Sequence, residues 1–60
     1  MKIWLGDEFD LSFRAKIKWI KENFNQDQYK IIETGFLINE YFVEFVDNKY
    51  ATIYYMQYPA

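Results

Sequence analysis

Residues 41–56 read YFVEFVDNKYATIYYM, and this stretch decides the fold that the sequence predicts. Two apolar runs, residues 41–46 and 50–56, flank the segment Asp47-Asn48-Lys49. Asp and Asn tolerate the positive φ angles that tight turns demand. The pattern therefore predicts a β-hairpin, whose side chains alternate between two faces of a sheet.

Both faces of this predicted hairpin are apolar, whereas a strand with one wet side alternates apolar with polar residues. Glu44 marks the outer face, because an isolated carboxylate is costly to bury. The outer face would also hold aliphatic and aromatic side chains, namely Phe42, Val46, Ala51, Ile53 and Tyr55. The opposite face, expected to pack against a helix, would hold Tyr41, Val43, Phe45, Tyr50, Thr52, Tyr54 and Met56.

That helix is predicted for residues 10–24. Phe13, Ile17, Ile20 and Phe24 recur at spacings of four, three and four, which places them in one stripe toward the core. Trp19 falls on the opposite side, so we expect it to be exposed as an anchor of an interface. A rotated helix, or a loop that covers the ring, is the alternative.

The remaining segments predict two more strands. Residues 1–5 alternate in polarity and end at Gly6, and residues 29–38 form a strand interrupted by Gly35, with Asn39-Glu40 as the turn into the hairpin. The expected fold is a single α+β domain, residues 1–60, in the order β-α-β-β-β. One amphipathic helix would pack on a small antiparallel sheet of three or four strands.

Composition limits the chemistry that the chain can perform. Its 60 residues contain no cysteine and no histidine, which excludes disulfides, the usual Cys/His zinc site, and the commonest general base and nucleophile. Asp7, Glu8 and Asp10 precede the helix, where capping is a better interpretation than metal binding. We therefore expect no enzyme activity, no cofactor and no metal. No apolar run or leader suggests a membrane or export, so a cytoplasmic location is expected.

A protein-binding module that acts by occupying a partner's surface is the function predicted from the doubly apolar hairpin. Acidic residues would steer the encounter, in a chain of net charge −2. We also expect a homodimer through the outer sheet face, because one helix covers only one side of a sheet. The expected partner-binding residues are Lys18, Trp19, Glu22, Phe42, Glu44, Val46, Ile53 and Tyr55.

Two other functions stay open. Arg14, Lys18 and Lys21 with Trp19 form a small basic and aromatic set for single-stranded nucleic acid or a nucleotide, although the acidic total opposes it. A structural subunit of a larger assembly is the other alternative. In size and composition the chain is similar to the small stand-alone inhibitors that bacteriophages and mobile elements encode against host proteins, and this similarity implies inhibition without catalysis.

Overall fold

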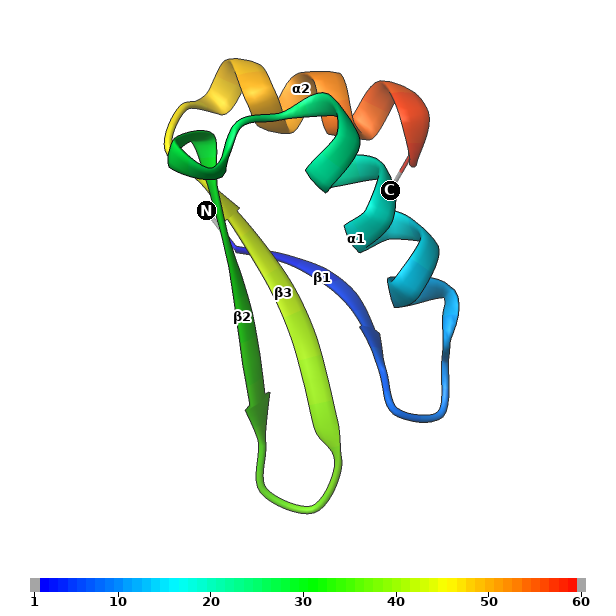
Figure 1. The fold of residues 1–60 in the computed structure, drawn as a ribbon. Helices are drawn as coiled ribbons and strands as arrows, with labels where there is room; N and C mark the ends of the chain where they lie inside the picture. Colours follow the sequence, from blue (N-terminus) through cyan, green and yellow to red (C-terminus); the bar gives the residue numbers. More distant parts are fainter. Residues whose placement is uncertain (1, 60) are drawn as a thin grey trace.

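The computed structural model describes residues 2–59, which form a three-stranded antiparallel sheet with two α-helices packed on it (Figure 1). Along the chain the elements are β1 (Lys2–Asp7), α1 (Ser12–Asn23), the short 3-10 helix η1 (Gln26–Gln28), β2 (Tyr29–Gly35), β3 (Asn39–Phe45) and α2 (Asn48–Gln57). The predicted α+β class is confirmed. The predicted element order is wrong at its end, where a helix replaces the last strand.

Helix α2 forms where the second arm of the hairpin was predicted. The Asp47 carboxylate, expected to lie in a turn, accepts a hydrogen bond from the Lys49 amide at 3.0 Å and caps the helix. Ala51 and Tyr54 are buried at a spacing of three residues, as one face of a helix requires. Residues 50–56 are apolar or aromatic except for Thr52. One polar residue is too few to distinguish the strand period of two from the helical period of 3.6.

Strand β3 lies in the middle of the sheet and is antiparallel to both neighbours. Val43 is paired with Ile3 on β1 and with Ile31 on β2. Strands β1 and β2 therefore run parallel to each other with β3 between them. The turn between β2 and β3 spans residues 36–38, so the turn predicted at residues 39–40 is wrong. Asn39 instead begins β3, paired with Gly35.

The core lies between one sheet face and the two helices. Val43 and Phe45 are buried on that face, which confirms the prediction that they point toward the helix. The helical stripe is confirmed at Phe13, Ile20 and Phe24, although Phe24 follows the last turn of α1. The other buried side chains come from β1 and α2, and they are Ile3, Leu5, Ala51 and Tyr54. We call the sheet face that carries Val43 and Phe45 the inner face.

Trp19 is half-buried, so its predicted exposure is wrong. Its ring makes edge-on contacts with Phe24, Tyr54 and Tyr58, at centroid distances of 5.8, 6.2 and 5.9 Å. Helix α2 packs against the side of α1 that a single-helix fold would leave in water. The ring is covered, as the alternative expected, but by a second helix rather than by a loop.

Acidic side chains shape the turn that leads into α1. Asp7 accepts hydrogen bonds from the amides of Phe9 and Asp10, both at 2.8 Å, and Asp10 accepts one from the Ser12 amide at 3.1 Å. The hydrogen bonds from Ser12 hold the pKa of Asp10 below its ordinary value. These carboxylates hold the turn before α1 and do not cap the helix, because its N-cap residue is Leu11 and no side chain of the described residues caps α1. The predicted capping role is therefore wrong. The first predicted strand began at Met1, which lies outside the described residues.

No helix between Lys2 and Pro59 has the length and apolar character needed to cross a bilayer.

Candidate protein-binding surfaces

The turn between β2 and β3 and the loop between β1 and α1 lie at the same end of the molecule, away from α2 (Figure 1). Two hydrogen bonds join these segments. The Glu8 amide donates to the Asn39 carbonyl at 3.0 Å, and the Asn39 amide donates to Glu8 Oε1 at 3.3 Å. The loop is therefore tied to the start of β3, directly after the β2–β3 turn.

Four large apolar side chains on these two segments are exposed to solvent, and we call them the apolar end. The exposed fractions are 99% for Phe36, 87% for Leu37, 78% for Phe9 and 54% for Leu11. Sequence reasoning missed all four, because residues 36 and 37 were assigned to a strand and the loop was considered only for its acids. The signal was present in the apolar pair directly after Gly35, where a turn was possible.

The apolar end is surrounded by negative charge. Glu8 and Asp10 flank Phe9 in the loop, Asp7 ends β1 directly before it, and Glu40 is paired with Asp7 across the β1–β3 ladder. Among these carboxylates, those of Asp7 and Asp10 are held by backbone amides and so have fixed positions. The surface thus combines an apolar centre with an acidic rim.

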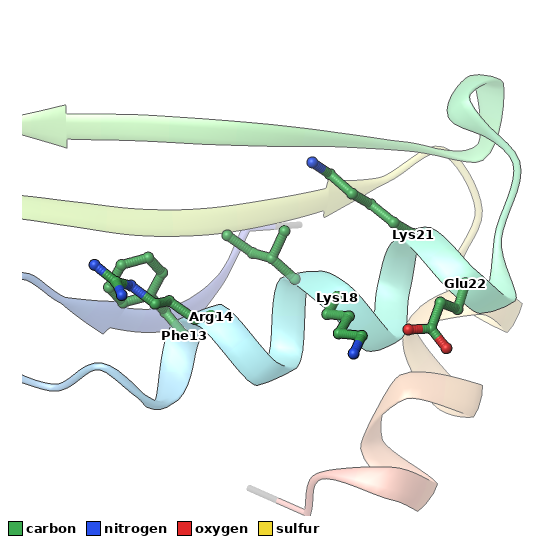
Figure 2. A pocket seen from close by; sticks show the side chains of 6 residues that line it. Phe13, Arg14, Lys18, Lys21 and Glu22 are labelled. Atoms are coloured by element: carbon green, nitrogen blue, oxygen red, sulfur yellow. The ribbon is translucent and has the colours of Figure 1, made fainter.

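A groove of about 490 Å³ runs along α1, and Figure 2 shows the side chains around it. It exists because α1 packs chiefly against β1, while α2 packs against β3. The inner face of β2 is left partly open, and Tyr29 and Ile31 on it are only half-buried. The groove is lined by Phe13, Arg14, Ile17, Lys18, Lys21 and Glu22.

One end of this groove is closed by an aromatic stack. The rings of Phe13 and Tyr41 lie 4.0 Å apart with nearly parallel planes. The Tyr41 hydroxyl donates a hydrogen bond to Glu33 Oε2 at 3.0 Å, and this bond raises the pKa of Tyr41. Phe13 and Ile17 supply the apolar part of the groove lining.

The structure brings four of the predicted site residues together at this groove: Arg14, Lys18, Lys21 and Glu22. Three of them are basic, so the rim of the groove carries a charge opposite to that of the apolar end. Trp19, predicted to join them, lies in the aromatic cluster between α1 and α2 instead.

The outer face of the sheet has no helix from the described residues upon it and carries one apolar row. Trp4, Phe42 and Ile32 are directly opposite one another across the three strands. In the next row Glu44 lies between Lys2 and Lys30.

The predicted outer patch is wrong in its composition. Phe42 and Glu44 are on the outer face, but Val46 follows the end of β3, and Ile53 and Tyr55 belong to α2. They were grouped by a strand period that the chain does not adopt. The homodimer stays a prediction, which on this face would depend on the row of Trp4, Phe42 and Ile32.

A second cavity, of about 320 Å³, lies between β1 and the end of α2. The Lys16 ammonium group donates to the Leu5 carbonyl at 3.3 Å and lies 6.0 Å from the centre of the Tyr58 ring. Burial raises the pKa of Tyr54, which also lines this cavity, to about 12. The Lys16 ammonium group is bonded within the chain, so we assign the cavity a structural role.

Between Lys2 and Pro59, no three acidic side chains are grouped closely enough to hold a metal ion. No protein-family model, curated protein or solved structure matches the chain.

Proposed function

We propose that this protein is a non-enzymatic protein-binding module. Its apolar end would insert into an apolar pocket of a partner protein, and basic side chains would rim that pocket. The observation that carries the proposal is the exposure of Phe9, Leu11, Phe36 and Leu37 on two hydrogen-bonded segments at one end of the molecule. Large apolar side chains grouped on a surface and rimmed by polar residues mark interaction sites.

The geometry favours insertion because the apolar end is held in place before binding. The β2–β3 turn is supported by paired strands, and Glu8 ties the neighbouring loop to Asn39. Binding then orders few additional groups, which reduces its entropic cost. The acidic rim supplies long-range attraction toward a basic pocket and accelerates association. The same charge repels the anionic surface of a membrane, which disfavours a lipid partner.

Such a module acts by occupying a partner's surface, and this needs no catalytic side chain. Phage- and mobile-element-type inhibitors of host proteins act in this way, and we propose that role for this chain. The target would be a protein whose own ligand is acidic, because its pocket must be basic at the rim.

The test compares two double variants with the wild type in capture from lysate of the native host, with quantitative mass spectrometry. Phe36→Ser with Leu37→Ser removes the tip of the apolar end. Val46→Ser with Met56→Ser removes two well-exposed apolar side chains outside the apolar end and serves as the control. We expect a specific protein to be retained by the wild type and the control and lost by the tip variant. The retained protein should then bind the wild type in purified form.

Retention of the same proteins by the tip variant would refute the proposal. So would binding of the wild type to anionic lipid vesicles that is lost in the tip variant, because that result would make a membrane the partner. Circular dichroism should show equal folding of the three proteins, since the substituted side chains are exposed.

A second candidate function is binding of single-stranded nucleic acid. The observation that favours it is the direct pairing of Trp4 with Phe42 on an open sheet face, in the row next to Lys2 and Lys30. Adjacent aromatic rings on a sheet can stack successive bases, and lysines can contact the phosphates. It ranks second because Glu44 lies between the two lysines and the chain is acidic overall.

Salt separates this candidate from protein binding. Binding of an oligothymidylate should weaken steeply between low and moderate salt, because counterions are released, and Trp4→Ala should abolish it. Insertion into a protein pocket should weaken much less over the same range, because the rim charges mainly set the association rate and the apolar contact holds the complex.

A further inference from the structure

The free edge of β2 carries unpaired backbone groups. The Val46 amide donates to the Gln28 carbonyl at 3.1 Å, at the start of the β2–β3 ladder. Hydrogen-bonded pairs alternate along an antiparallel ladder, so Lys30, Ile32 and Thr34 bond to β3. The residues between them point their N–H and C=O groups toward the free edge, and they are Tyr29, Ile31 and Glu33.

The groove lies on the side of the sheet to which these edge residues direct their side chains. Ile31 is paired with the buried Val43, and Glu33 is paired with Tyr41, which stacks on Phe13 in the groove. A strand added to β2 would alternate in the same way, so every second side chain would lie on the groove side. Figure 2 shows Lys21 extending from α1 in the direction of β2, toward that position.

The charge of the groove selects the chemistry of the added strand. Arg14, Lys18 and Lys21 contribute three positive charges to the lining, against one negative charge from Glu22. The chain as a whole is negative, so this surface differs in sign from its surroundings. Figure 2 shows the Lys18 side chain pointing away from the sheet and Lys21 extending toward β2, so a carboxylate on the groove side of an added strand would meet Lys21. Exposed edge strands are templates for pairing with another chain.

We propose that β2 accepts an extended acidic segment of a partner protein as a fourth strand. Backbone hydrogen bonds to Tyr29, Ile31 and Glu33 would hold the segment, and its alternate carboxylates would lie over the groove. This surface is separate from the apolar end. Variants at residues 36 and 37 leave the edge of β2 intact. A failure of the strand-addition proposal can therefore be distinguished from a failure of the proposal that the apolar end binds a partner.

The test uses a synthetic peptide that alternates glutamate with valine and matches the seven residues of β2. Glu33→Pro removes the amide hydrogen that faces the free edge, without removing a donor that β3 uses. Glu33→Ala is the matched control, because it removes the same carboxylate and keeps the amide. We expect the Pro variant to bind the peptide about tenfold more weakly than the Ala variant, since one backbone acceptor is left unpaired. Thermal melts should show both variants folded.

Two further measurements sharpen the result. N-methylation of the peptide, one amide at a time, should reduce binding at every second position, which is the signature of strand pairing. Lys21→Glu should weaken binding several-fold, whereas Lys49→Glu on α2 should not, because Lys49 is not among the groove residues.

Equal affinity of the Pro and Ala variants would overturn the inference, as would equal binding of a peptide that alternates arginine with valine. Absence of peptide binding at millimolar concentration would also overturn it. Sedimentation tests whether the edge binds a second copy of this chain. If the wild type self-associates and Glu33→Pro abolishes this self-association, the edge binds another copy and the acidic-segment proposal is wrong.

Discussion

The ring of Phe13 on α1 lies flat against the ring of Tyr41 on β3, with centroids 4.0 Å apart and planes inclined by 9°. This stack joins α1 to the middle strand at the end of the sheet where β1 is irregular. Gly6 lies beside the same ring, because a Cβ atom on Gly6 would be 3.1 Å from Phe13 Cβ. One aromatic side chain thus links the helix, the central strand and the bulge in β1.

Replacing Phe13 with Ala should lower the free energy of unfolding by about 3 to 5 kcal/mol, because it removes a buried aromatic ring and leaves a cavity. That loss is comparable to the whole stability of many small domains, so the variant should be largely unfolded. Lys18→Ala, on the exposed rim of the groove, is the control and should change stability by less than about 0.5 kcal/mol. Urea unfolding followed by circular dichroism measures both. Equal stability of the two variants would show that the Phe13–Tyr41 stack contributes little to the free energy of unfolding.

Replacing Gly6 with Ala should destabilise the protein by about 1 to 3 kcal/mol, a typical cost of a strained backbone conformation. Gly6 has a φ of 150°, which other residues rarely adopt. The added methyl group would also lie 2.9 Å from the Asp10 carbonyl oxygen, which is too close. A thermal melt unchanged from the wild type would contradict this account of the β1 bulge.

The stability of the protein should fall as the pH rises from about 10 to about 12. Burial raises the pKa of Tyr54 to about 12 from an ordinary value of 10.0. Within this window the unfolded chain releases the Tyr54 proton while the folded protein retains it, so ionisation favours unfolding. Below pH 10 both states keep the proton and the contribution is complete. Tyr54→Phe has no such proton and should lose less stability between pH 9 and 11.5 in urea titrations. Parallel losses in the two proteins would contradict this prediction.

The two tryptophans should differ in their access to solvent. Trp4 on the outer sheet face is 46% exposed, whereas Trp19 is packed against Phe24, Tyr54 and Tyr58. Iodide should therefore quench the fluorescence of Trp19→Phe, which retains Trp4, much more strongly than that of Trp4→Phe. The reverse order would support the single-helix arrangement in which Trp19 faces solvent.

The sequence predicted α1 and the inner face of β3 because the spacing of apolar residues is unambiguous in both. In α1 it fits only the helical period of 3.6 residues, and in β3 it fits only the strand period of two. Phe13, Ile20 and Phe24 are separated by polar residues on α1, and Glu44 sets the alternation of β3. The segment that forms α2 has no such markers. Its turn residue, Asp47, is equally suited to cap a helix, and only packing against α1 and β3 decides between the two.

The candidate surfaces were predicted less well than the fold, because a surface depends on which faces the tertiary structure covers. Lys18 and Glu22, both among the predicted partner-binding residues, line the groove, which follows from the position of α1 over β1. Trp19 was assigned to the interface because nothing in its local sequence announces α2. Phe36 and Leu37 were missed because a turn of apolar residues contradicts ordinary turn composition.

The pairing of β1 with β3, with β2 on the far side, sets the order in which the chain can fold. The β2–β3 hairpin joins neighbours in sequence, and its loop is short. Ile3 meets Val43 only after most of the chain between them has been ordered, which carries a larger entropic cost of loop closure. The hairpin should therefore form early and the N-terminal strand should dock late. Until β1 docks, β3 presents a second free edge, so the half-folded chain is the form of this protein most exposed to misassembly.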